Sequence, residues 1–134
     1  MESKATKGTY GQDYPAIAPS QALLAGQVGV LPQLRKDATT RTNVGVLNVG
    51  DAEVAVEVRL FDATGAEVGD VTAATVAAGR YWQQDDIFTS SGAGAQPIAY
   101  ATVVATTDGG AIWAYASVID AATGDPTTVP VQRQ

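Results

Sequence analysis

Apolar and charged residues alternate most clearly over Glu53–Phe61. From residue 53 to residue 60 every second residue is a large aliphatic one, and the residues between them are Ala, Glu or Arg, so one face is apolar and the other charged. This period of two predicts a half-buried antiparallel strand. Asp62-Ala63-Thr64-Gly65 then has the composition of a tight turn, in which Asp caps and Gly supplies a positive φ. We therefore expect Ala66–Val71 to return as the partner strand of a hairpin.

Two longer apolar segments follow later in the chain. Ile98–Thr106 and Ala111–Ile119 are apolar on both faces, which predicts central positions in a sheet. Between them lies Thr107-Asp108-Gly109-Gly110, and its Asp-Gly step is typical of a hairpin turn. The sequence therefore predicts that these two strands pair with each other.

The remaining segments complete an all-β pattern, since no helical period of useful length appears. Seven or eight short strands at spacings of about ten residues predict an immunoglobulin-like antiparallel β-sandwich, with a small barrel as the alternative. Pro32 and Pro130 indicate edge positions, and Trp82 is large enough to help close an end of the sandwich. The other expected strands are Gln27–Leu31, Arg41–Val49, Thr72–Gln83 (broken near Ala78-Gly79) and Thr127–Val131.

The first 26 residues differ from the rest, because they mix Gly, Pro, Ser and Ala without a sustained period. Pro15 and Pro19 exclude a long helix there. We therefore divide the chain into an N-terminal extension, residues 1–26, and a sandwich domain, residues 27–134. The extension is a linker or tag remnant, or a docking strand that packs on its own domain or on a neighbouring copy. If it docks, the expected anchors are Tyr10, Tyr14, Ile17, Leu23 and Leu24.

The amino-acid composition limits the catalytic groups and metal ligands that the chain can offer. Among 134 residues there is no Cys and no His, which excludes a thiol nucleophile, a His-based triad and an ordinary zinc site. We therefore expect a protein that is not an enzyme and has no cofactor. The remaining metal candidate is calcium, for which loop carboxylates are suitable ligands. Those carboxylates, which equally serve as turn residues, are Asp108, Asp120 and Asp125.

Charge and hydropathy limit the partners. The formal net charge is −6 and the basic residues are dispersed, so nucleic acid and anionic membranes are poor partners. No apolar run approaches the roughly 20 residues that span a bilayer, so no membrane insertion is expected. The polar N-terminus lacks the apolar core of a signal peptide. The chain is therefore either cytoplasmic or a mature segment that was given a start methionine.

Two further groups of residues are candidate sites. Adjacent residues of an extended chain point to opposite sides, so Asp85-Asp86 do not form the facing carboxylate pair of a glycosidase and are better explained as a solvated loop or helix cap. Exposed aromatic rings would stack on sugars. Trp113 and Tyr115 lie two apart on one strand and share a face, which is more typical of a core than of a binding platform. The other available rings are Tyr81 and Trp82.

Three segments together carry a family resemblance. Arg41–Asn48 (RTNVGVLN) resembles the "R-T-N/D-hydrophobic…N" strand of repeated β-sandwich modules in secreted and cell-surface bacterial proteins. Phe61–Gly65 matches their "D-x-x-G" hairpin, and Ala114–Pro126 is similar to their closing "AYASVVD-x-x-TGDP" segment. Each motif also has a structural explanation: Asn43 and Asn48 can satisfy backbone groups, and Arg41 can pair with a carboxylate across the sheet.

The resemblance spans about residues 29–131 and implies an extracytoplasmic accessory domain without catalytic residues. The expected function is a non-enzymatic structural or interaction module of the cell surface or extracellular space. Such a module would self-assemble into a fibre or surface layer through its N-terminal segment, or bind another surface protein. The alternative is an accessory or adhesion domain that binds carbohydrate or calcium.

Overall fold

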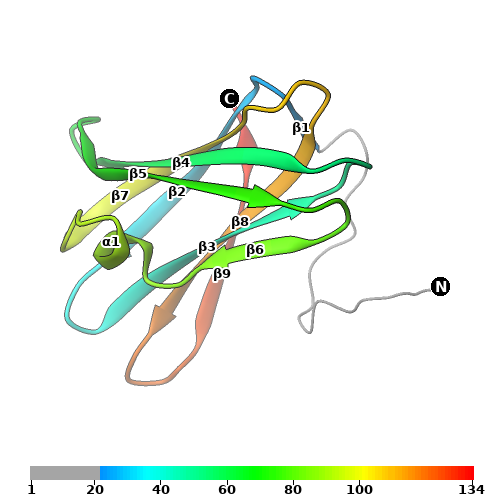
Figure 1. The fold of residues 1–134 in the computed structure, drawn as a ribbon. Coiled ribbons are helices and arrows are strands. Elements are labelled where there is room, and N and C mark those ends of the chain that lie inside the picture. Colours follow the sequence, from blue (N-terminus) through cyan, green and yellow to red (C-terminus); the bar gives the residue numbers. More distant parts are fainter. Residues whose placement is uncertain (1–21) are drawn as a thin grey trace.

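The computed structural model describes residues 22–134 and shows two antiparallel sheets packed face to face (Figure 1). This confirms the all-β sandwich. Helical structure among the described residues is limited to the single turn α1 (Ile87–Ser90). The strands are β1 (Leu23–Leu24), β2 (Val28–Lys36), β3 (Thr40–Asn48), β4 (Val54–Asp62), β5 (Glu67–Val76), β6 (Tyr81–Gln84), β7 (Gln96–Ala105), β8 (Ala111–Asp120), β9 (Pro126–Pro130) and β10 (Gln132–Arg133).

Each of the two sheets combines strands that are not consecutive in the chain. Sheet A has the order β1-β8-β3-β6, and β9 also pairs with β8. Sheet B has the order β10-β2-β7-β4-β5. Strands β1 and β9 share one edge of β8, since β1 pairs at its start and β9 pairs from Tyr115 to Ile119. Strands β7 and β8 are both internal, as their two apolar faces predicted.

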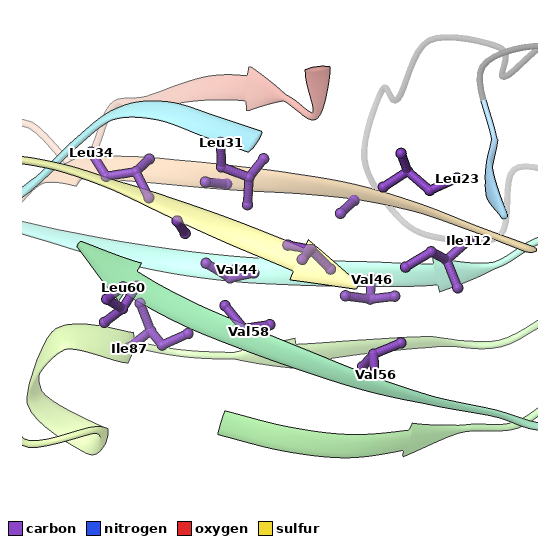
Figure 2. Close-up of a cluster of buried hydrophobic side chains, with 14 of the residues drawn as sticks. Leu23, Leu31, Leu34, Val44, Val46, Val56, Val58, Leu60, Ile87 and Ile112 are labelled. Carbon is purple, nitrogen blue, oxygen red and sulfur yellow. The ribbon is translucent and has the colours of Figure 1, made fainter. Parts of the chain in front are cut away.

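The core lies between the sheets (Figure 2). The alternating residues of β4 that the sequence predicted as buried point into it, and they pack with the even-numbered residues of β3 and β8. Helix α1 contributes Ile87 and Phe88, both fully buried. Trp82 packs against this core from β6. The central contributors are Leu31, Leu34, Val44, Val46, Val54, Val56, Val58, Leu60, Val103 and Ile112.

The β4–β5 hairpin is confirmed together with its turn chemistry. The carboxylate oxygen Oδ1 of Asp62 accepts hydrogen bonds from the N–H and the hydroxyl of Thr64 and from the N–H of Ala66. Gly65 has φ 86°. The expected boundary between strands at residues 71 and 72 is not present, because β5 continues through it to Val76. The irregularity in β5 is a bulge centred on Asp70, whose N–H donates to Ser91 O at 2.8 Å. The chain then passes from sheet B to sheet A between Val76 and Tyr81.

The predicted pairing of Ile98–Thr106 with Ala111–Ile119 is wrong. The turn forms, with Gly110 N–H donating to Thr107 O at 3.0 Å, but it connects β7 of sheet B to β8 of sheet A. Strand β7 pairs with β2 and β4, and β8 pairs with β3, β1 and β9. A turn motif specifies a chain reversal, whereas the hydrogen-bond partners of two central strands are chosen by the whole sheet.

The N-terminal part of the sandwich also departs from expectation. Strand β2 continues past Pro32 to Lys36 through an irregular step at Gln33, which has φ 59°. Because β10 pairs with β2 only at Gly29 and Val30, the missing N–H of Pro32 leaves no ladder bond unmade. The sandwich begins before residue 27, the predicted boundary, since Leu23 pairs with Ile112 and is buried in the core.

Candidate functional site

The outer face of sheet A, which points away from the core, carries two buried aromatic side chains. Odd-numbered residues of β8 lie on this face, because Ile112, Ala114 and Ala116 between them point into the core. Trp113 and Tyr115 are nevertheless only 5% and 2% exposed. Their rings stack with centroids 5.9 Å apart. The sequence correctly grouped the two rings on one face, but that face is not the inter-sheet core.

Tyr115 lies flat across the neighbouring strand β3 at Gly45. The two residues are direct cross-strand partners, and a Cβ atom at Gly45 would overlap the Tyr115 ring. The ring therefore requires glycine at this position. Beyond Gly45 the Tyr115 hydroxyl donates to Oε1 of Gln83 on β6 at 2.6 Å. Gln83 Nε2 in turn donates to Asp85 Oδ1 at 2.7 Å, so both ends of the Gln83 amide are engaged.

A polar groove of about 310 Å³ lies beside Trp113 and Tyr115 on the same face of sheet A. Its floor is the cross-strand pair Asn43 and Ser117, whose short side chains leave a depression in the sheet surface. The loop between β8 and β9 forms part of the opposite wall. The groove is lined by Arg41, Asn43, Gln83, Ser117, Ile119, Asp120, Ala121, Gly124 and Pro126.

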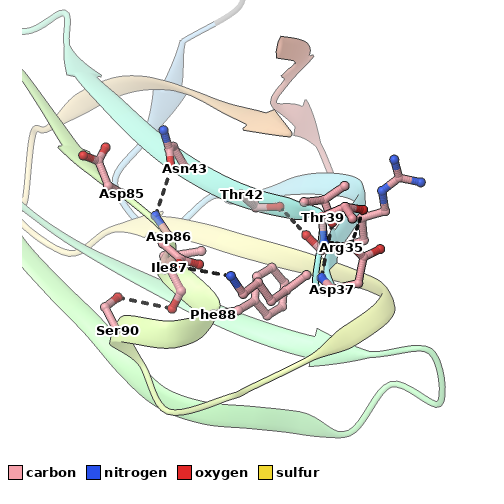
Figure 3. A network of polar contacts seen from close by, with 12 residues as sticks. Arg35, Asp37, Thr39, Thr42, Asn43, Asp85, Asp86, Ile87, Phe88 and Ser90 are labelled. Atoms are coloured by element: carbon pink, nitrogen blue, oxygen red, sulfur yellow. Dashed lines mark hydrogen bonds and ion pairs between the residues drawn. The ribbon is translucent and has the colours of Figure 1, made fainter. Parts of the chain in front are cut away.

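Asn43 is held in one orientation from the side of α1. The backbone N–H of Asp86 donates to Asn43 Oδ1 at 2.9 Å (Figure 3). Asp86 itself has φ 46°, and its Oδ2 pairs with Lys36 Nζ at 3.3 Å. Within residues 22–134 the Asn43 amide nitrogen donates no hydrogen bond, so its two N–H groups are available to the groove.

The acidic doublet does not form a catalytic pair. Asp86 occupies the N-cap position of α1, yet its side chain makes no capping hydrogen bond and instead binds Lys36. Asp85 accepts from Gln83. Among residues 22–134 neither carboxylate lies against a second one. Asp85 is exposed, as expected for a solvated loop, whereas the expected side-chain cap by Asp86 is not formed.

The three loop aspartates do not come together as a calcium site. Asp108 precedes β8 and Asp120 ends it, which separates them by about 30 Å for a ten-residue strand. Asp120 Oδ1 accepts from the N–H of Ala122 within the β8–β9 turn that also contains Asp125. Among residues 22–134 no group of three acidic side chains is arranged to hold a metal ion.

The other predicted residues have mixed outcomes. Asn48 does satisfy backbone groups: its Nδ2 donates to Ala52 O and Val76 O. The expected ion pair of Arg41 is not formed within the described part of the chain. Of the sugar-stacking candidates, Trp82 points into the core and Tyr81 is half exposed.

The docking anchors divide between described and undescribed residues. Leu23 is buried in the core of its own sandwich, and Leu24 is 54% exposed. Tyr10, Tyr14 and Ile17 lie outside the described residues. Sequence reasoning missed Gln83 and Ser117 altogether. Gly45 was the available signal, because an isolated glycine inside a strand indicates a close approach of another group.

Comparisons with known proteins bear on the fold alone. Thermotoga maritima 1070 is similar in structure, with a TM-score of 0.63 at 9% identity, covering 84% of this chain and 97% of that one. The Anabaena sensory rhodopsin transducer aligns with a TM-score of 0.48 at 17% identity, over 68% of this chain and 94% of that one. FlgD from Xanthomonas campestris aligns with a TM-score of 0.29 at 18% identity, over 81% and 70%.

No protein-family model matches the chain, and no curated protein matches it either. The resemblance to bacterial surface modules therefore remains a prediction. Within residues 22–134 no helix has the length and apolar character needed to cross a membrane.

Proposed function

We propose that this chain is a non-enzymatic structural and interaction module of the bacterial cell surface or extracellular space, which self-assembles through its N-terminal segment. In this proposal the segment containing Tyr10, Tyr14 and Ile17 packs on the outer face of sheet A and is exchanged between copies. The observation that carries the proposal is the burial of Trp113 and Tyr115, which point away from the core.

Large aromatic side chains on the solvent face of a sheet are ordinarily partly exposed, so their burial marks a packing surface. The N-terminal segment is the natural occupant because of where it joins the sandwich. Leu23 pairs with Ile112, and Ala22, one residue further from β2, is only 6% exposed. Ala22 thus directly precedes the strand that pairs with the start of β8, the strand that carries Trp113.

The edge of β8 explains why β1 is short. Val131 N–H donates to Ala114 O, and β9 pairs with β8 from Tyr115 onward, so β1 is limited to the two residue pairs at Leu23 and Leu24. A strand of two residue pairs contributes little stability by itself. Exchange of such a terminal element between identical copies is a low-cost route to assembly, and head-to-tail exchange builds filaments.

The hinge for such an exchange is the tight connection Ala25–Gln27. Gln27 N–H donates to Leu24 O at 3.0 Å, and Gly26 has φ 84°. Opening this turn would extend β1 away from its own sheet and leave the Leu23 position in the core for another copy. Short connections of this kind favour exchange.

A disulfide trap tests the proposal, because the chain has no cysteine of its own. Leu24 and Ala111 are direct cross-strand partners, a spacing that suits a disulfide. In the full-length double variant Leu24→Cys/Ala111→Cys, exchange predicts a ladder of covalent oligomers after oxidation, read on a non-reducing gel. The control pair Glu57→Cys/Ala73→Cys joins the β4–β5 hairpin and should give only monomers.

Only monomeric product from the 24/111 pair, at every protein concentration, would overturn self-assembly. Sedimentation velocity supplies a second measurement. Oligomers of the unmodified chain should disappear when residues 1–21 are deleted, and oligomers that survive the deletion would exclude the segment as the assembling element.

A further inference from the structure

We propose that the polar groove on the outer face of sheet A binds a small organic carboxylate that carries a hydroxyl or ammonium group on the adjacent carbon. This binding activity goes beyond self-assembly and uses different residues. At about 310 Å³ the groove lies at the lower end of the range for small-molecule sites.

Arg41 supplies the charge that recognises a carboxylate. Its side chain lines the groove and makes no ion pair within residues 22–134. Arg59, on the outer face of sheet B, provides a contrast, because it binds both Glu57 and Glu67. A guanidinium without a carboxylate partner presents a planar set of donors that matches a ligand carboxylate.

The floor adds further hydrogen-bonding groups. Asn43 is 7% exposed and Ser117 is 9% exposed. Neither the Asn43 amide nitrogen nor the Ser117 hydroxyl is hydrogen-bonded within the described residues, and neither is among their fully buried atoms that lack a partner, so both are open to the groove. Because Asp86 holds the Asn43 carbonyl oxygen, the amide N–H groups remain as donors. Arg41 and Asn43 lie two residues apart on β3 and therefore on the same face.

Asp120 indicates the second group of the ligand. Its Oδ1 accepts from Ala122 N–H, and its other oxygen has no partner among residues 22–134. Arg41 and Asp120 line the same groove without pairing with each other. Opposite charges kept apart in this way suit a ligand that has both a carboxylate and a hydrogen-bond donor. A sugar is the weaker candidate, because Trp113 and Tyr115 are buried and Gln83 is already engaged at both ends.

Titration of the ¹⁵N-labelled full chain, followed by NMR, tests this site with glycolate, glycine and methyl glucoside as probes, each to roughly 20 mM. We expect glycolate or glycine to shift the amide resonances of residues 41–43 and 117–121 saturably, with no such effect from methyl glucoside. Arg41→Gln should weaken binding by about tenfold, the effect of losing a charged hydrogen-bond partner. The control Arg59→Gln should leave binding unchanged.

Three results would overturn the proposal: no saturable shift with either acid, a saturable shift with methyl glucoside alone, or unchanged affinity in Arg41→Gln. Arg41 is exposed, so its replacement should not affect folding. The disulfide trap at residues 24 and 111 does not involve the groove residues, so failure of one proposal is distinguishable from failure of the other.

Discussion

The two outer faces of the sandwich differ although both belong to five-stranded antiparallel sheets. On sheet B, Arg59 contacts Glu57 and Glu67 at 3.4 and 3.3 Å, with all three side chains about 40% exposed. Phe61 and Tyr100 stack at 4.9 Å in a partly exposed pair, and Ile98 is 65% exposed. On sheet A, Trp113 and Tyr115 are buried and a polar groove lies beside them.

This difference separates a solvated face from a packing face. Exposed ion pairs such as those of Arg59 contribute about 0–1 kcal/mol, so the outer face of sheet B has few stabilising contacts. The outer face of sheet A buries two of the largest side chains in the chain and places a glycine beneath one of them. Residues of the same type on the two faces should therefore contribute differently to the free energy of unfolding, and substitutions can measure this difference.

The largest expected effect is a contrast between two tyrosines. Tyr115→Ala should lower the free energy of unfolding by about 3–5 kcal/mol, as expected for a buried aromatic side chain. Tyr100→Ala removes a partly exposed ring and should cost about 1 kcal/mol. Urea denaturation of both variants measures the contrast. Equal losses would mean that the two faces are energetically alike.

A smaller effect is expected at Gly45. Gly45→Ala should cost about 1–3 kcal/mol, because the added methyl group displaces the Tyr115 ring and its hydrogen bond to Gln83. In a Tyr115→Ala background the same substitution should be nearly neutral. A double-mutant cycle measures this coupling. If the losses in the free energy of unfolding from the two single substitutions simply add, the Tyr115 ring is not the reason why position 45 requires glycine.

The smallest effect concerns turn carboxylates. Hydrogen bonds from the side chain and backbone of Thr64 hold the pKa of Asp62, in the sheet B hairpin, below its ordinary value of 3.8. The backbone N–H of Thr39 and the hydroxyl of Thr40 similarly lower the pKa of Asp37, in the turn that enters sheet A. A lowered pKa contributes stability that is complete above the unfolded value and is lost as pH falls through the folded pKa.

Melting temperatures measured from pH 6 down to about pH 2 should therefore show a modest deficit of Asp62→Asn near neutral pH, which shrinks below about pH 4. Asp37→Asn should follow the same profile. A deficit that is independent of pH would show that the ionised carboxylate is not the cause.

Local patterns predicted those parts of the fold that depend on neighbouring residues. The alternation of Val54, Val56, Val58 and Leu60 with small or charged residues places one face against the core, and Asp62 closes the following turn through hydrogen bonds within four residues. The same reasoning failed for the β7–β8 connection, because Asp108-Gly109 reverses the chain equally well within a sheet or between two sheets. The groove was not predictable, since Asn43 and Ser117 become neighbours only through the pairing of β3 with β8.

The sequence by itself determined the all-β class, the internal positions of β7 and β8, and the absence of His and Cys chemistry. These properties depend on residue type and on the period of two along a strand. Tertiary structure alone decided that Trp113 and Tyr115 are buried on the outer face of sheet A, that Tyr115 covers Gly45, and that Arg41, Asn43, Ser117 and Asp120 line one groove. Such contacts join residues far apart in the chain, and their register is set by the packing of both sheets on a common core.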